Sequence, residues 1–320
     1  MTRKTSQKNI ILITGGCGYL GSQLIRDLVD NNAGDYKIRI LDNMQAKNYH
    51  ALMNLKREQV YQLIEGDILD PSIVAVALED VDIVIHLAAI VQTPMSFENQ
   101  TWVNQVNHWG TARLIEACID AGVKKFIYAS SSAVYGPGGP FRENDICRPF
   151  GAYAQSKYKA ERSVLSAIDR GLESVILRFG TIYGFSPSVR FDAVANRFAY
   201  LAGSNRSLVV FGQGDQVRPF VHVCDASSAV QFCIHDISKF VGNIFNIVGV
   251  NASVLDLVNA IQSFLPDVGI RFTEQDVLTH LSIKVSNEKI LEGGWKPKFS
   301  LEEGLRELVE KFSGLDGAYY

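Results

Sequence analysis

The sequence has few of the features that mark secreted, membrane or nucleic-acid-binding proteins. Its 5 cysteines in 320 residues are an odd number without a Cys-x-x-Cys pair, which favours reduced thiols in a cytoplasmic protein over disulfides or a zinc site. With 31 basic and 34 acidic residues and no basic run, nucleic acid is not the expected partner. No apolar run reaches the length of a membrane span, and residues 10–13 are too short for a signal peptide, so we expect no membrane association.

The composition and the hydrophobic pattern indicate a globular α/β protein. Hydrophobic residues make up 47% and charged residues 20% of the chain, enough to form a large core without metal or disulfides. Short apolar, β-branched runs alternate with amphipathic segments, as expected for a doubly wound parallel sheet of the Rossmann type. The expected strands are residues 10–13, 38–41, 60–64, 81–87, 125–129 and 174–178, and the expected helices between them include 21–30, 102–121 and 153–170.

A glycine-rich turn follows the first expected strand and opens the first expected helix. Residues 14–21 read TGGCGYLG, which fits both Gly16-x-Gly18-x-x-Gly21 and Gly15-x-x-Gly18-x-x-Gly21. Glycines allow a tight turn and close approach to a pyrophosphate, whose charge faces the amides at the helix N-terminus. The turn therefore predicts a dinucleotide site, and its spacing leaves open whether the fold is the general one or the short-chain dehydrogenase variant.

An acidic residue at the end of the second expected strand indicates which dinucleotide binds. Asp42 and Asn43 stand about 20 residues beyond Gly21, where a carboxylate can accept hydrogen bonds from both ribose hydroxyls. Asp42 would repel the 2′-phosphate of NADP, and no arginine follows to hold that phosphate. We therefore expect NAD as the cofactor, with a solvated acidic turn as the alternative interpretation of Asp42.

A tyrosine and a lysine are expected one turn apart on the same helix face. Tyr153 and Lys157 could form a base if a lysine and a positive nicotinamide favour the phenolate over the phenol, whose ordinary pKa is about 10. Alone, such a pair is more typical of an exposed helix than of a catalytic site. However, the serine-rich segment around Ser131 lies upstream at the end of an expected strand, where open α/β sheets bind ligands.

Together these motifs resemble the extended short-chain dehydrogenase/reductase family. The similarity is to its NAD-dependent nucleotide-sugar epimerase/dehydratase branch, the UDP-glucose 4-epimerase-like proteins, and it extends over nearly the whole chain. The motifs that carry it lie at residues 14–21, 66–68, 86–89, 107, 110–111, 128–136, 153, 157, 177–179, 183–184, 218–223, 225, 294–297 and 300–301.

The resemblance implies a role for each matching position. It implies that Ser131, Tyr153 and Lys157 are catalytic, that Ser131 also contacts substrate, and that no metal takes part. Arg218 matches an arginine that binds the diphosphate of a nucleotide sugar, with a structural salt bridge as the alternative. Thr181 replaces a substrate-binding asparagine of the family. The implied cofactor-binding residues are Gly15, Gly18, Tyr19, Leu20, Gly21, Asp42, Asn43, Asp67, Ile68, Leu87, Ala88, Ala89, Asn107, Tyr153, Lys157 and Phe179.

The residues after Ser131 favour one reaction within the family. Its members begin by oxidising C4 of the sugar with NAD, and those that eliminate water or decarboxylate carry acidic residues directly after the catalytic Ser/Thr. Here those positions are Ser132 and Ala133, which cannot protonate a leaving hydroxyl. We expect epimerisation at C4 of a nucleoside-diphosphate sugar through a 4-keto intermediate. The alternatives are a 4-ketosugar reductase or dehydrogenase and a non-catalytic dinucleotide-binding protein.

The rhythm of strands and helices changes near residue 180, which predicts a second, smaller C-terminal α/β lobe for the substrate. We expect residues 1–180 to form the dinucleotide-binding domain, with return segments at about 219–248. Residues 181–218 and 249–320 would form the substrate lobe, and Ser300 with Glu303 predicts a helix capping box within it. We interpret His86 and His222 as packed structural histidines. By resemblance, helices 102–121 and 153–170 would pair two chains into a homodimer.

Overall fold

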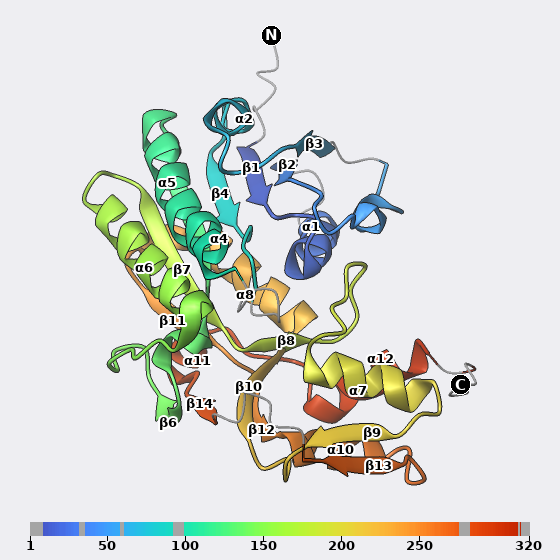
Figure 1. The fold of residues 1–320 in the computed structure, drawn as a ribbon. Coiled ribbons are helices and arrows are strands. Elements are labelled where there is room, and N and C mark those ends of the chain that lie inside the picture. The colour runs from blue at the N-terminus through green and yellow to red at the C-terminus, as the bar shows by residue number, and fades with distance from the viewer. Residues whose placement is uncertain are drawn as a thin grey trace.

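A seven-stranded parallel sheet forms the centre of the molecule, in the order β3-β2-β1-β4-β5-β7-β11. The computed structural model describes residues 9–31, 36–57, 61–91, 99–274, 282–312 and 314. The sheet and the helices on both of its faces confirm the predicted doubly wound fold (Figure 1). Its strands are β1 (Asn9–Thr14), β2 (Tyr36–Asp42), β3 (Tyr61–Glu65), β4 (Ile83–His86), β5 (Lys125–Ser131), β7 (Glu173–Phe179) and β11 (Ile244–Ile247).

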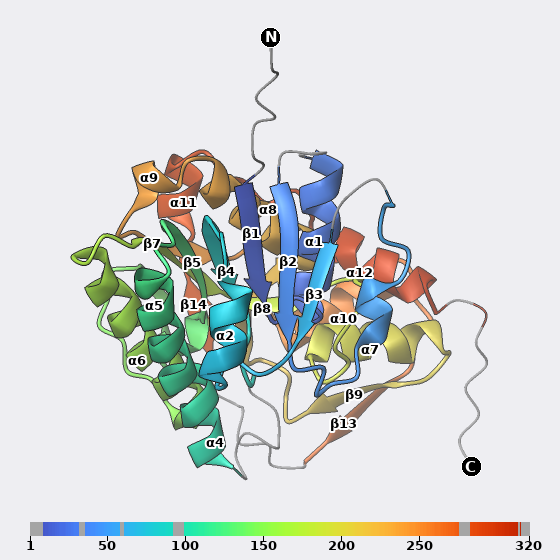
Figure 2. The same cartoon turned by 90° about the horizontal axis from the view of Figure 1, so that it is seen from above.

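Both faces of the central sheet are buried because its strands carry apolar residues toward each side. In β1, Ile11 and Ile13 enter the core on one face, while Leu12 enters the core on the other. Figure 2 shows the two helical layers. One layer holds α1 (Tyr19–Asn31), α8 (Val223–His235), α9 (Ile237–Phe240) and α11 (Glu288–Glu292), and the other holds α2 (Pro71–Ala77), α4 (Gln100–Asn104), α5 (Thr111–Asp120) and α6 (Gly151–Ile168).

The helix predicted over residues 102–121 is interrupted in its middle. Between α4 and α5 the backbone forms the π-helical segment η2 (Gln105–Gly110). Within it, the Asn107 side chain exchanges two hydrogen bonds of 2.8 Å with the main chain of Ile90. The Thr111 hydroxyl then donates to the Asn107 carbonyl at 2.7 Å. The wider turn thus carries a long-range contact, which the helical period of the sequence does not reveal.

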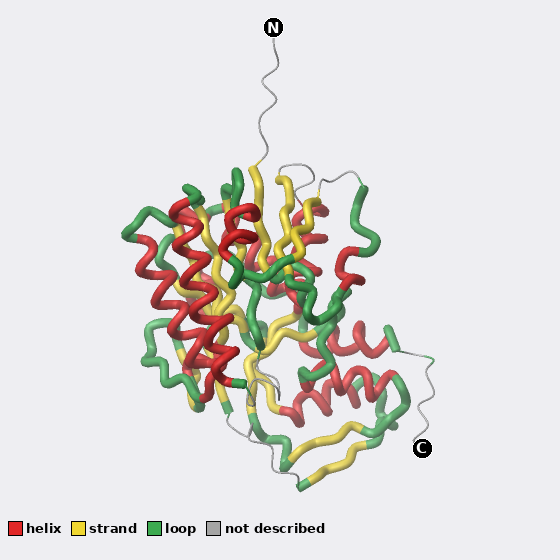
Figure 3. The backbone as a smooth tube through the Cα atoms, turned by 45° about the horizontal axis from the view of Figure 1, so that its top comes forward, coloured by secondary structure: helices red, strands yellow, loops and turns green. Residues whose placement is uncertain are grey.

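The smaller lobe packs helices against short strands below the end of the central sheet (Figures 1 and 3). The predicted capping box is confirmed at the last of its helices, where Ser300 and Glu303 bond reciprocally. Its strands are β8 (Thr181–Tyr183), β10 (Val217–His222) and β12 (Val250–Ser253) in one sheet, with β9 (Leu208–Phe211) and β13 (Ile270–Thr273) as a parallel pair. Its helices are α7 (Val194–Gly203), α10 (Val254–Gln262) and α12 (Leu301–Glu310).

The chain passes between the central sheet and the smaller lobe more than once. After β7 it enters the smaller lobe through β8, and it returns to the central sheet with α8 and β11, while β10 pairs with β8 and β12. The remaining elements are η1 (Tyr49–Leu52), η3 (Ser132–Tyr135), and the pair β6 (Gly138–Phe141) with β14 (Ile283–Val285), of which β14 also packs against η3 and β10. None of the helices in the described ranges combines the length and the apolar character that a membrane span requires.

Candidate active site

The glycine turn lies where β1 delivers the chain to α1, directly against the end of β4. Gly15 has a φ of +69°, and a Cβ on it would stand 2.6 Å from the Ala88 nitrogen. A Cβ on Gly21 would stand 2.6 Å from the carbonyl oxygen of Gly16. Both positions therefore require glycine, because backbone occupies the space that a side chain would need. The packing brings Gly15, Leu87 and Ala88 together at the first turn of α1.

The side chain of Tyr19 faces the smaller lobe. Its hydroxyl donates to the Gly184 carbonyl and accepts a hydrogen bond of 3.0 Å from the Asn196 amide, and burial raises its pKa. The hydroxyl of Ser186 donates to the Tyr19 carbonyl at 3.0 Å. The predicted cofactor role of Tyr19 and Leu20 stays a prediction; their main-chain amides lie in the first turn of α1, where no carbonyl of the helix precedes them. Sequence reasoning missed this contact between the lobes, since its partners lie far apart in the chain.

The acidic residue at the end of β2 is held against the glycine turn. One Asp42 carboxylate oxygen accepts the Cys17 N–H at 2.9 Å, and the other accepts the Met44 N–H at 3.0 Å. Each oxygen keeps a second lone pair, and the side chain is half-buried at the rim of the sheet. The Asn43 amide donates to the Asp67 carboxylate at 3.0 Å, which joins the ends of β2 and β3.

Most of the other predicted cofactor residues lie at the same edge of the sheet, but the side chain of Asn107 is bonded to the main chain. Leu87, Ala88 and Ala89 are half-buried after the end of β4, and Ile68 is buried in the core cluster against which Ala88 packs. The side chain of Asn107, however, is buried and bonded to the main chain of residue 90. This side chain therefore positions the segment after β4, and the predicted place of Asn107 in the lining of the cofactor stays a prediction.

The three predicted catalytic residues meet at the carboxyl end of β5. The Tyr153 hydroxyl hydrogen-bonds Ser131, whose own oxygen accepts the Ala133 N–H at 3.2 Å. The Lys157 ammonium, one helical turn further along α6, donates to the Ala129 carbonyl at 2.7 Å. Lys157 is 4% exposed, while Tyr153 is half-buried. β5 thus orients both helix residues through its last three positions.

The charges at this site are set mainly by burial. Burial lowers the pKa of Lys157 to about 7, against the opposing pull of Glu161. Burial also raises the pKa of Tyr153, and the hydrogen bond with Ser131 and the charge of Arg190 offset this only in part. We expected Lys157 to lower the pKa of Tyr153, but the groups of the protein together raise this pKa, and the two that lower it are Ser131 and Arg190. The lysine points to a carbonyl of β5 and carries only part of a charge near neutral pH.

The two strand-end histidines are packed in the interior, as interpreted from the sequence. His86 lies between the hydroxyls of Thr14, at 2.6 Å, and Thr111, at 2.8 Å, and burial lowers its pKa to about 3. His222 stacks on Phe299 with ring centroids 3.9 Å apart, and burial lowers its pKa to about 4. Both rings are neutral near pH 7 and act as packing elements.

The predicted substrate residues lie on adjacent strands of the smaller lobe. Thr181 on β8 pairs in parallel with Phe220 on β10, two residues beyond Arg218. Burial lowers the pKa of Arg218, whose side chain is half-buried. On the central sheet, Phe179 is the strand neighbour of Ser131, so β7 brings the predicted cofactor residue and the predicted catalytic serine side by side.

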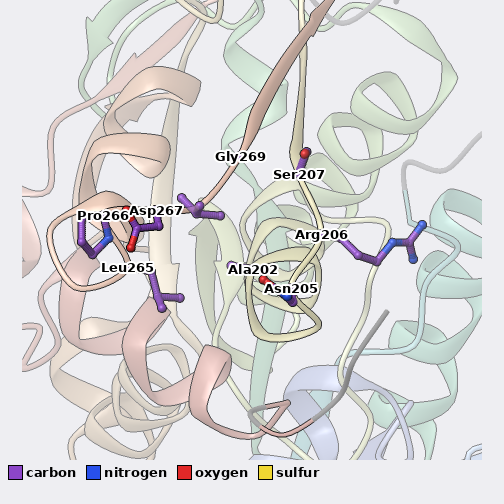
Figure 4. Close-up of a pocket in the computed structure, with 9 residues that line it drawn as sticks. Ala202, Asn205, Arg206, Ser207, Leu265, Pro266, Asp267 and Gly269 are labelled. Carbon is purple, nitrogen blue, oxygen red and sulfur yellow. The ribbon is translucent and has the colours of Figure 1, made fainter. Parts of the chain in front are cut away.

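A pocket on the smaller lobe lies apart from these residues (Figure 4). It opens between the end of α7 and the loop that precedes β13, and none of the predicted site residues lines it. Its lining residues are Ala202, Asn205, Arg206, Ser207, Leu265, Pro266, Asp267, Val268 and Gly269.

Residues 11–248 match the model of the NAD dependent epimerase/dehydratase family. The chain belongs to this family. Membership confirms the resemblance inferred from the motifs, and with it NAD as the cofactor of the family. The match spans the glycine turn, the β5–α6 site and Arg218.

Relatives in the epimerase/dehydratase family carry names of both reactions. "dTDP-D-glucose 4,6-dehydratase" of Mus musculus is 33% identical, over 94% of this chain and 87% of that protein. "Putative UDP-glucose 4-epimerase" of Methanocaldococcus jannaschii is 32% identical, over 94% and 97%. The UDP-glucose 4-epimerase of Thermotoga maritima, solved with UDP-glucose, superposes with a TM-score of 0.82 at 28% identity, over 95% and 98%. The UDP-glucuronic acid 4-epimerase of Bacillus cereus, solved with UDP-glucuronic acid and NAD, gives 0.82 at 26%, over 95% and 98%.

Proposed function

We propose that the protein epimerises a nucleoside-diphosphate sugar at C4, through a transient 4-keto intermediate. The observation that carries the proposal is the set of Ser131, Tyr153 and Lys157 with no acidic residue at the two positions that follow Ser131. Ser132 is buried and Ala133 is apolar, so neither could protonate a leaving hydroxyl. An epimerase needs a base, a hydride acceptor and room for the sugar to turn, and it does not need such an acid.

The residues at the sheet edge fit NAD. The glycine turn brings backbone, without side chains, up to the first amides of α1, where a pyrophosphate would bind. Asp42 would accept the ribose hydroxyls, and Asn43, Asp67 and Ile68 would surround the adenine. Leu87, Ala88, Ala89, Asn107 and Phe179 would support the rest of the dinucleotide. When bound, NAD supplies the acceptor for the C4 hydride and a positive ring beside the tyrosine.

The chain's own residues would handle the proton. The Tyr153 oxygen would take the proton of the C4 hydroxyl, and Ser131 would hold the same oxygen of the sugar through its hydroxyl. Since burial raises the pKa of Tyr153, the phenolate needs positive charge nearby to form at neutral pH. Lys157 would supply part of that charge and bind the nicotinamide ribose. After the sugar turns, Tyr153 would return the proton to the oxygen at C4.

The smaller lobe would select the substrate. Arg218 would form charge-assisted hydrogen bonds with the diphosphate, and Thr181 on the neighbouring strand would contact the sugar or the nucleotide. The epimerases solved with UDP-glucose and UDP-glucuronic acid support a nucleotide-sugar substrate by their similarity to the chain.

The proposal includes a cytoplasmic homodimer. Trp109, which is 57% exposed on η2, would lie in the contact between the two chains.

The test is incubation with UDP-, GDP-, CDP- and dTDP-sugars, with products identified by NMR. We expect one C4 epimer pair to interconvert without added NADH. We expect Tyr153→Phe to lower the rate about 10²–10⁴-fold while fold and NAD binding survive, since the change removes only the base. Near-normal rates in this variant would contradict the mechanism. A 4-keto-6-deoxy sugar would assign the dehydratase reaction, and NADPH consumption would assign a reductase.

A further inference from the structure

A buried carboxylate lies one helical turn beyond the lysine of the proposed active site. Glu161 on α6 is 1% exposed, and one of its oxygens accepts a hydrogen bond of 2.5 Å from the Ser130 hydroxyl. Ser130 stands between the two β5 residues that bind the lysine and the tyrosine. The last three positions of β5 therefore contact three successive turns of α6, and the third of these contacts ends on a carboxylate.

An arginine from the neighbouring strand fixes this carboxylate. Arg178 on β7 is the strand neighbour of Ser130, and it donates to both Glu161 oxygens, from Nε at 2.9 Å and from Nη2 at 2.7 Å. The two side chains are 3% and 2% exposed. Burial opposes the charge of Arg178, but the bonds to Glu161 outweigh it and raise the pKa of the guanidinium. Arg178 also donates to the Glu143 carbonyl at 3.2 Å and lies 4.8 Å from the centroid of the Tyr135 ring.

Among the groups around Lys157 in the described part of the chain, Glu161 is the one that supplies negative charge. The ring of Tyr128 lies 5.0 Å from the ammonium, and burial keeps the pKa of that phenol well above its ordinary value. Burial likewise keeps His86 neutral, and Tyr153 is protonated near neutral pH because its pKa is raised. The pull of Glu161 opposes the effect of burial on the pKa of Lys157.

We infer that Glu161, fixed by Arg178 and Ser130, is a positioning residue that keeps Lys157 charged and aligned on β5. The consequence for catalysis rests on the proposed function, but the effect on the lysine does not. A merely structural ion pair would affect stability when it is broken, and it would leave the titration of Lys157 unchanged. Titration of the lysine therefore separates the two roles.

The experiment measures the pKa of Lys157 by NMR in protein labelled with ¹³C at the lysine ε-carbons. The signal is assigned by its absence in Lys157→Met. In Glu161→Gln we expect the pKa of Lys157 to fall by about one to two pH units, because a nearby opposite charge is lost. The alkaline limb of epimerisation should move to lower pH by a similar amount. Glu161→Asp keeps the negative charge, so the pKa of Lys157 and the alkaline limb should stay close to their wild-type values.

A matched control is Glu116→Gln, which breaks an exposed pair with Arg170 at 2.5 Å and should change neither readout. Should Glu161→Gln not fold, the double variant with Arg178→Met removes both charges together. It should show a fall in the same direction, smaller than in the single variant because a positive charge is lost as well. An unchanged Lys157 titration in these variants would overturn the inference. A shifted titration in a protein that epimerises no sugar would instead refute the proposed function and leave the role of Glu161 standing.

Discussion

The buried lysine of the proposed active site should lower the stability of the protein, so that removing it should raise the free energy of unfolding. Lys157 is 4% exposed, and burial lowers its pKa from the ordinary 10.5 to about 7. An unfolded chain keeps this lysine charged at pH 7, whereas the folded chain loses about half of that charge. The perturbation we propose is Lys157→Met, which keeps the length of the side chain and removes the ammonium.

The magnitude follows from the two pKa values. At about 1.4 kcal/mol per pH unit, the difference corresponds to a cost of about 4 kcal/mol at neutral pH. The substitution also removes the hydrogen bond from Lys157 to the Ala129 carbonyl, and leaving that acceptor without a donor costs about 1–2 kcal/mol. We therefore expect Lys157→Met to raise the free energy of unfolding by about 2–3 kcal/mol at pH 7, while the proposed activity is lost.

The sign of the pH dependence makes the test specific. Because the folded pKa of Lys157 lies below the unfolded one, the wild type gains stability as the pH rises from about 7 toward 10.5. The advantage of Lys157→Met should therefore shrink by about 2 kcal/mol between about pH 7 and pH 9. Urea unfolding of both proteins at several pH values measures this difference, in which other titrating groups cancel. A less stable variant at pH 7, or a difference independent of pH, would refute the reasoning.

Three further predictions address other parts of the molecule. Wild-type protein should bind NAD more tightly than NADP by calorimetry, and Asp42→Ala should reduce that preference; equal affinities in the wild type would remove the argument. Arg218→Ala should raise KM for the nucleotide sugar at least about tenfold with NAD affinity nearly unchanged, and an unaltered KM would make Arg218 structural. Since protonation of His86 favours unfolding below its ordinary pKa of 6.5, the wild type should lose about 2 kcal/mol more than His86→Gln between about pH 7 and pH 5; equal losses in chemical denaturation would argue against it.

Much of the fold and of the site follows from local features of the sequence. The strand β1, the glycine turn and α1 are contiguous, so apolar periodicity and glycine spacing were enough to predict them. Tyr153 and Lys157 share a helix face through their spacing alone. The serine segment precedes them at the end of a strand, and parallel strands present their carboxyl ends at one edge. That rule is sufficient to bring Ser131 toward α6.

What only the tertiary structure decided depends on contacts between residues distant in the chain. No local pattern shows that the Tyr19 hydroxyl donates a hydrogen bond to the Gly184 carbonyl. Nor does one show that the Asn107 side chain, in a π-helical turn, bonds the main chain of residue 90. The charge of Lys157 is likewise invisible in its motif, because it depends on how deeply α6 buries the lysine and on Glu161, which Arg178 fixes from another strand. Spacing along one element sets which side chains share a face, whereas burial and the identity of partners are set by packing between elements. The sequence therefore predicts which residues form the proposed site, and the packing between elements determines the charge that they carry.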